Sequence, residues 1–305
     1  MTAGGSGAPR VLEAEVALPA RCELAESPVW DARRQRLLWV DILAGHVHAL
    51  HPASGVHSWF PVGTPVGAVG LTSAGGLVMA LLDGFAVAGA DGDQLTRLPG
   101  LLTDASAVRF NDGKPDPWGG FCAGTMQWRD GGSPGCLYRL SPDGDITELV
   151  PGVTTSNGLD WSDDRRRFYY VDSPTGGIDV FDTDPHTGAL SNRRRFTDVP
   201  AAIGMPDGLT IDAEGGIWVA LWGGGALHRY LPDGRLEAVV RVPASQVTSL
   251  AFGGADLDVL YITTAHEDFT AGDLEAEPHA GDIFCCTAGV TGRAPFRFAA
   301  DFLGR

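Results

Sequence analysis

The sequence predicts an all-β protein, a six-bladed β-propeller with a central channel. Two observations predict it: one phrase recurs six times along the chain, and the hydrophobic period typical of helices is almost absent. The six copies occupy Pro28–Gly55, Gly70–Leu82, Asn111–Met126, Gly158–Asp182, Gly208–Gly234 and Ser249–Ala265. Successive copies therefore start 42, 41, 47, 50 and 41 residues apart. This spacing is typical of propeller blades of four short strands.

Each copy has the same order of elements. A short apolar run is followed by an Asp- or Gly-rich turn, a second run rich in β-formers, another turn and a third run. In the first copy the apolar run is Pro28–Trp30, Asp31 opens the turn and Leu37–Ile42 is the second run. Short strands of even spacing with turn residues between them favour a propeller. The alternative is a β-sandwich whose similar segments arose by accident.

The two ends of the chain are expected to behave differently. Residues 1–10 (MTAGGSGAPR) are expected to be a flexible tail, since they lack the apolar segment of a signal peptide. Residues 11–305 are expected to form one propeller domain. We expect EAEVAL near residue 15 to pair with the C-terminal FRFAADF (residues 296–302) in one blade and so close the ring.

Charge and hydropathy exclude two classes of partner. The 305 residues carry 22 Lys and Arg against 38 Asp and Glu, a formal net charge of −16. A nucleic-acid partner is not expected, because phosphate backbones are bound by clustered basic residues. The uncharged stretch Pro61–Leu82 is long enough for a bilayer, but its two prolines and five glycines break it into short β-like pieces. No membrane association is expected.

The cysteines and two histidines favour a structural interpretation. The five cysteines are Cys22, Cys122, Cys136, Cys285 and Cys286. An odd number without a CxxC motif argues against a disulfide framework or a thiolate metal site, so we expect buried, reduced thiols and a cytoplasmic location. His46 and His48 alternate along one strand, but no third ligand is evident, and we expect both on an outer face.

Polar residues recur at one position of the repeat. Asp116 and Asp212 open the same Asp-x-x-Gly-Gly turn in two copies. Five residues before this turn lie polar residues in four copies, namely Glu26, Asn111, Asn157 and Asp207. The second copy has no polar group there and carries Val69. Because radial repeats place equivalent residues around one axis, these four side chains are expected to meet in the channel.

Two carboxylates and two amides on one axis predict a cation site. Like charges in a confined channel repel each other unless a cation joins them. Oxygen ligands without sulfur or imidazole suit Ca²⁺, Mg²⁺ or Mn²⁺. The alternative is a set of buried polar groups that cap strand ends or are bridged by water.

Several longer motifs resemble the SMP-30/gluconolactonase/regucalcin family, over essentially residues 20–300. The motifs are Ala25–Asp31 with Leu38–Ile42, Arg109–Asp116, Gly124–Met126, Ser156–Trp161 and Pro206–Leu209. The resemblance implies a six-bladed propeller and, for most members, a metal-dependent sugar lactonase.

The resemblance also implies roles for individual residues. It places a single divalent cation on Glu26, Asn157 and Asp207, and it places substrate on Arg109 and Asn111. It further implies that Asp207 both binds the metal and transfers a proton, which makes Asp207 the expected catalytic base.

One departure from the family leaves the sugar open. In members of the animal type, an acidic residue two positions past Gly-Thr-Met contacts the sugar hydroxyls, whereas here the stretch reads Gln127-Trp128-Arg129. Gln127 and Trp128 are therefore candidate channel-entrance residues. His266, in the triplet His266-Glu267-Asp268, is a third.

The expected function is hydrolysis of a small-molecule sugar lactone to the aldonic acid. The cation, which could be Ca²⁺, Mg²⁺, Mn²⁺, Zn²⁺ or Fe²⁺, would polarise the lactone carbonyl, lower the pKa of a bound water, or both. Two alternatives stay open: a calcium-binding regulatory propeller without turnover, and a propeller hydrolase acting on another cyclic ester or a phosphotriester. A propeller needs no obligate interface, so a monomer or weak homo-oligomer is expected.

Overall fold

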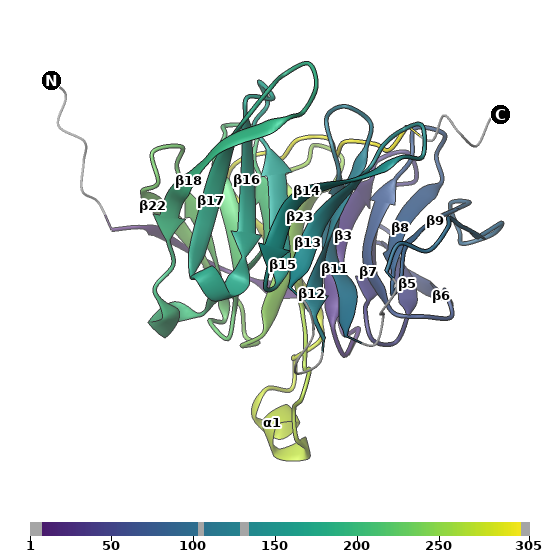
Figure 1. Ribbon diagram of the computed structural model, residues 1–305. Helices are drawn as coiled ribbons and strands as arrows, with labels where there is room; N and C mark the ends of the chain where they lie inside the picture. Colours follow the sequence, from purple (N-terminus) through teal and green to yellow (C-terminus); the bar gives the residue numbers. More distant parts are fainter. Residues whose placement is uncertain (1–7, 103–106, 129–133, 300–305) are drawn as a thin grey trace, which may run out of the picture.

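A computed structural model describes residues 8–102, 107–128 and 134–299 (Figure 1). The described chain forms six small sheets arranged in a ring, which confirms the predicted six-bladed β-propeller. Within each blade the first strand lies innermost and its successors follow outward as antiparallel neighbours.

Each blade contains four antiparallel strands, and the fifth blade gains one more. The first two blades are β3 (Ala25–Asp31), β4 (Arg36–Asp41), β5 (His46–His51) and β6 (Val56–Pro61), then β7 (Val66–Leu71), β8 (Leu77–Leu81), β9 (Phe85–Ala88) and β10 (Thr96–Arg97). The next two are β11 (Val108–Pro115), β12 (Phe121–Gln127), β13 (Gly135–Leu140) and β14 (Ile146–Val153), then β15 (Ser156–Trp161), β16 (Arg167–Asp172), β17 (Gly177–Thr183) and β18 (Leu190–Asp198). The last two are β19 (Met205–Ile211), β20 (Ile217–Trp222), β21 (Ala226–Tyr230), β22 (Leu236–Arg241) and β1 (Arg10–Glu13), then β23 (Val247–Gly253), β24 (Val259–Thr264), β25 (Ile283–Thr287) and β2 (Glu15–Leu18).

The hydrophobic core lies between the blades. Each pair of neighbouring blades shares its own cluster of buried apolar side chains, which gives six clusters for six interfaces in the described chain. Trp218 and Phe252, for example, meet edge to face between the fifth and sixth blades, with ring centroids 6.0 Å apart. Burying such a ring contributes about 1.5–3 kcal/mol. The packed faces hold the innermost strands in contact around the channel.

The repeated Asp turn has a structural cause. Asp116 Oδ1 accepts hydrogen bonds from the backbone N–H groups of Trp118 (2.8 Å) and Gly120 (2.9 Å). Asp212 Oδ1 does the same with Glu214 (2.9 Å) and Gly216 (2.8 Å). A buried carboxylate that satisfies two turn N–H groups fixes the reversal from the first to the second strand of a blade.

The ring is closed by the N-terminal segment, in a different way from the one expected. β2 pairs antiparallel with β25, and β1 pairs parallel with β22 of the fifth blade. The described part of the expected partner FRFAADF, residues 296–299, instead lies by the second blade, where Phe298 is buried and bridges to Thr72; residues 300–302 lie outside the described residues. That segment was a poor candidate because residues 283–287 already supply the third strand of the sixth blade. The expected tail also ends earlier, since β1 begins at Arg10.

Among the residues that the structure describes, helical structure is limited to short segments. η1 (Ser173–Thr175) and η2 (Ala201–Ile203) are 3₁₀ helices, and α1 (Ala271–Ala276) is a six-residue α-helix that projects away from the ring (Figure 1). In the described ranges no helix has both the length and the apolar character needed to cross a bilayer. All five cysteines are free, as expected, and Cys285 is the one that is not fully buried.

Candidate active site

The inner strands of the propeller carry a β-bulge at one equivalent point. Pairing with the second strand is interrupted between Glu26 and Val29 in β3, and at the matching places in β11, β15 and β19. A bulge leaves residues out of the ladder and turns their side chains in a new direction. The residues released or flanked by these bulges are Glu26, Asn111, Asn157 and Asp207.

The second blade keeps the bulge without a functional side chain. Its register shift lies between Val66 and Ala68, so Gly67, rather than Val69, is the equivalent residue. A Cβ atom on Gly67 would lie 2.6 Å from the carbonyl oxygen of Asn111. Glycine therefore lets this blade pack closely beside the strand that carries Arg109 and Asn111.

The structure brings the five residues predicted to bind metal or substrate into one cavity. Its volume is about 190 Å³. The residues lining it are Leu24, Glu26, Arg109, Asn111, Met126, Thr155, Asn157, Ser173, Pro174, Met205, Asp207, Trp222 and Glu267. Apolar walls with a few convergent polar groups are typical of small-molecule sites.

A chain of hydrogen bonds fixes the two amides. Arg109 Nη1 donates to Asn111 Oδ1 at 2.7 Å, and Asn111 Nδ2 donates to Asn157 Oδ1 at 3.1 Å and to the Ser156 carbonyl at 3.0 Å. Asn157 Nδ2 then donates to Ser173 Oγ at 2.8 Å. Each amide thus has one orientation, and the Asn157 oxygen keeps a lone pair available for a further partner.

The two carboxylates are buried and under-satisfied. Glu26 Oε2 accepts the N–H of Ser27 at 2.9 Å, whereas Asp207 Oδ1 is buried without a hydrogen-bond partner in the described chain. Burial raises the pKa of both carboxyl groups well above their ordinary values. Repulsion from Asp112 raises the Glu26 pKa further, and repulsion from Glu26 and Asp112 raises that of Asp207. This is the arrangement that a cation stabilises.

Arg109 and Glu267 face the same cavity from different blades. Burial lowers the pKa of Arg109, while the nearby charge of Glu267 opposes that change. Burial raises the pKa of Glu267, and Arg109 opposes it. Arg109 Nε is buried and has no partner among the described residues. An opposed cation and anion with a free donor can bind the hydroxyl and carbonyl oxygens of a polar ligand.

Comparison with known proteins shows where this site belongs. Residues 24–266 match the family model described as SMP-30/Gluconolactonase/LRE-like region. The chain belongs to this family. The pentonolactonase XacC of Haloferax volcanii is 40% identical over 281 residues, which are 90% of this chain and 94% of that protein. Regucalcin of Gallus gallus is 38% identical over 286 residues, which are 92% of this chain and 96% of regucalcin.

A solved structure of the family has the same architecture. The crystal structure of regucalcin from Agrobacterium tumefaciens, described as a calcium-binding protein, superposes with a TM-score of 0.90 and 30% identity. The match covers 95% of this chain and 99% of that one. The family's fold is therefore present over almost the whole chain.

Two residues that line the cavity adjoin the entrance residues predicted from sequence. Met126 directly precedes Gln127 and Trp128, and Glu267 directly follows His266. Gln127, Trp128 and His266 are not among the described lining residues, and their position at the channel entrance stays a prediction.

Ser173 was missed altogether. It is the first residue of η1, between β16 and β17, and its hydroxyl donates to the Pro206 carbonyl at 2.7 Å while accepting from Asn157. No repeat position marks it, because it lies in a connecting loop outside the inner strands.

Proposed function

We propose that this chain is a divalent-metal-dependent lactonase that opens sugar lactones to aldonic acids. The observation that carries the proposal is the buried set of hard oxygen ligands beside Arg109 in one cavity, with Asp207 Oδ1 lacking a partner among the described residues. The family relationship supports the reaction class, since a relative that is 40% identical is a pentonolactonase.

Glu26, Asn157 and Asp207 are the residues that would hold the cation. Their donor atoms are two carboxylates and one amide oxygen, a set that suits Ca²⁺, Mg²⁺ or Mn²⁺ better than softer metals. A bound divalent ion would act as a Lewis acid toward the lactone carbonyl or lower the pKa of a water. Two features of the described residues support such an ion: Asp207 Oδ1 is buried without a hydrogen-bond partner, and burial raises the pKa values of Glu26 and Asp207.

Three side chains of the cavity would form hydrogen bonds with the substrate. Arg109 Nε–H can donate to an oxygen of the lactone. Both N–H groups of the Asn111 amide are engaged with Ser156 and Asn157, so Asn111 has only an Oδ1 lone pair left and would accept from a sugar hydroxyl. Glu267 would accept from another hydroxyl, in place of the acid missing after Met126.

Asp207 would move the proton. Its free Oδ1 can accept a proton from the water that attacks the carbonyl, and the same proton can then pass to the ring oxygen as the ester bond breaks. The products are one carboxylic acid and one hydroxyl on the same open chain, so no atom is left over. A base within hydrogen-bond reach of the attacking water contributes about 10²–10⁴-fold to the rate.

A second function is favoured by one finding. A regucalcin structure described as a calcium-binding protein covers nearly the whole chain at a TM-score of 0.90. The side-chain oxygens of Glu26, Asn157 and Asp207, called the oxygen ring below, could therefore serve as a calcium site without turnover. Hydrolysis of another cyclic ester or of a phosphotriester is less well supported, because Arg109, Asn111 and Glu267 place hydrogen-bonding groups suited to sugar hydroxyls among the apolar walls of the cavity.

A pH-indicator assay on a panel of γ- and δ-aldonolactones tests the proposal. Chelator-stripped protein is assayed alone and with Ca²⁺, Mg²⁺, Mn²⁺, Zn²⁺ or Fe²⁺, with spontaneous hydrolysis subtracted. The proposal expects turnover that returns with metal. A silent panel, with calorimetry still detecting one bound Ca²⁺, would instead favour the binding protein.

A further inference from the structure

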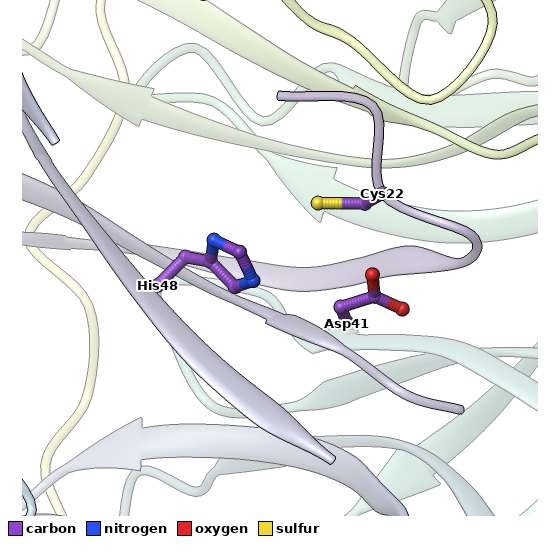
Figure 2. A group of neighbouring side chains, drawn as sticks. All are labelled: Cys22, Asp41 and His48. Atoms are coloured by element: carbon purple, nitrogen blue, oxygen red, sulfur yellow. The ribbon is translucent and has the colours of Figure 1, made fainter. Parts of the chain in front are cut away.

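Cys22, Asp41 and His48, none of which lines the channel cavity, meet in a buried cluster (Figure 2). Cys22 lies between β2 and β3, Asp41 ends β4 and His48 lies in β5, so three separate segments contribute. One ligand atom from each, the Cys22 sulfur, an Asp41 oxygen and a His48 ring nitrogen, all lie within 4.8 Å of one another. All three residues are buried, so His48 does not lie on the outer face expected for it.

His48 is held with one nitrogen aimed into this cluster. His48 Nδ1 lies 3.0 Å from Nε2 of His57, which is exposed on the edge strand β6. His48 Nε2 is buried and has no partner within the described chain. In the tautomer in which His48 Nδ1–H donates to His57, the Nε2 lone pair is bare, and this is the tautomer that could bind a metal through Nε2. A buried polar atom left unpaired costs about 1–3 kcal/mol, so its persistence here calls for a partner.

The other two ligands are already fixed in place. The Asp41 carboxylate accepts the backbone N–H groups of Glu23 at 3.0 Å and Leu24 at 3.2 Å. The Trp39 indole N–H points to the Cys22 sulfur at 3.5 Å. Each ligand atom keeps a lone pair, so these contacts position the groups without using them up.

The protonation states agree with a metal ligand set. Burial, helped by His57 and His46, lowers the pKa of His48 to about 4, so its ring is neutral at pH 7. Burial and the nearby Asp41 carboxylate raise the pKa of the Cys22 thiol to about 12, so the free protein keeps the proton. A bound metal would replace that proton, which passes to solvent as the metal–sulfur bond forms.

We propose that Cys22, Asp41 and His48 form a second metal site, selective for a borderline transition metal such as Zn²⁺ and structural in role. A sulfur, nitrogen and oxygen set differs in kind from the all-oxygen ring in the channel. Because the three atoms lie within 4.8 Å of one another, an ion can lie within about 2.8 Å of each of them, and shifts of at most about 0.5–0.8 Å reach Zn–S and Zn–N lengths. The ion would fasten the segment ahead of β3 to β4 and β5, four residues before Glu26.

Cobalt substitution tests this site without relying on activity. The full chain is stripped, saturated with Ca²⁺ so that the oxygen ring is occupied, and titrated with Co²⁺. The proposal expects a thiolate-to-cobalt charge-transfer band that saturates at one equivalent and is lost when Zn²⁺ competes. The oxygen ring has no sulfur ligand and cannot give this band, so lactonase activity and the band can succeed or fail separately.

Variants assign the ligands. Cys22→Ser should remove the band. His48→Gln should lower the affinity for Co²⁺ by more than the roughly 10- to 100-fold that is typical when a partner of a ligand is lost. Cys285→Ser, in the neighbouring blade, should leave the band unchanged. Absence of the band in the folded wild-type protein would overturn the proposal, and so would a band that survives in Cys22→Ser. If Cys22→Ser fails to fold, His48→Gln and the wild-type titration still decide.

Discussion

Asp207 has two proposed roles in the site, as a metal ligand and as the proton acceptor. Its Oδ1 atom is buried and has no hydrogen-bond partner among the residues that the structure describes, and its side chain lines the same cavity as Glu26 and Asn157. Removing its charge would weaken metal binding and remove the proton acceptor together, whereas a residue that binds substrate alone would affect KM first.

This contrast gives the first prediction. Asp207→Asn should lower kcat by about 10³-fold or more, because general-base and metal contributions are lost together. Asn111→Ala should mainly raise KM, by about tenfold, since one hydrogen bond to a hydroxyl is worth about 1.4 kcal/mol. Steady-state kinetics on the best lactone measures both. Asp163→Asn, whose side chain is 97% exposed, is the matched control. Near-wild-type turnover by Asp207→Asn would sink the assignment.

Ser173 is predicted to act through Asn157 and not on substrate. Ser173→Ala removes the acceptor for Asn157 Nδ2 and so frees the amide to rotate. Loss of such an outer partner typically costs 10- to 100-fold in metal affinity. Calorimetric titration with Ca²⁺ should show that loss, while kcat at saturating Ca²⁺ changes little. The exposed Ser54→Ala serves as the control, and equal affinities for the two variants would refute the role.

The residues that could be predicted from sequence are those tied to the repeat. Glu26, Asn111, Asn157 and Asp207 share one position of the repeat, so the spacing from the turn predicts that they meet in one cavity, whereas the roles of single residues come from the family resemblance. Ser173 and Glu267 come from loops of variable length, where no register links one blade to another. Their presence in the cavity depends on three-dimensional closure of the ring.

At the scale of the strand, the bulges of the inner strands turn the site residues toward the channel. The hydrophobic pattern of the sequence alone cannot show a bulge, although one extra residue moves every following side chain of the strand to the opposite face of the sheet. The same limit explains the wrong partner expected for β2: the sequence does not show whether residues 283–287 or FRFAADF pair with it, and only the packed sheet shows that β25 does.

Gly158, next to Asn157 in the bulge of β15, should tolerate no side chain. A Cβ atom there would lie 2.5 Å from the backbone oxygen of Asp207. Gly158→Ala should therefore force β15 away from β19, with a cost of about 1–3 kcal/mol and weaker Ca²⁺ binding. Thermal unfolding and calorimetry measure the two effects. Gly100→Ala, where a Cβ meets nothing within 4 Å, should change neither. A wild-type melting temperature for Gly158→Ala would contradict this packing.

The propeller as a whole was predictable because its repeat is visible in the sequence. Six copies at nearly even spacing leave little choice of architecture, and each blade interface is built from the same alternating apolar positions. The Cys22, Asp41 and His48 cluster belongs to no repeat position, and it could be found only once three segments were folded together.

The stability of the whole molecule should respond jointly to pH and metal. Burial raises the pKa of Glu26 and Asp207, so their protonated forms stabilise the metal-free fold at low pH, and this contribution is lost as pH rises from about 4 through the raised values. Cation binding, in contrast, needs the ionised carboxylates of Glu26 and Asp207. The rise in Tm on adding Ca²⁺ should therefore be larger at pH 8 than at pH 5, about 5–10 °C at 100-fold above its Kd.

Differential scanning calorimetry with and without Ca²⁺ at each pH isolates this effect, because groups distant from the site cancel in the difference. The Glu26→Gln/Asp207→Asn double variant should show no Ca²⁺-dependent rise at either pH. A rise of equal size at both pH values in the wild-type protein would argue against these two carboxylates as the ligands.

The most direct test of the central claim is a metal titration of the reaction itself. Chelator-stripped protein receives Ca²⁺ or Mn²⁺ in fractions of an equivalent, and the initial rate of opening of the best aldonolactone is measured at each step. We expect the initial rate to rise in proportion to added metal and to level off at one equivalent. The rate of the Asp207→Asn variant should not rise at any metal level. Full activity in the stripped protein with chelator present, or no lactone opened at any metal level, would contradict it.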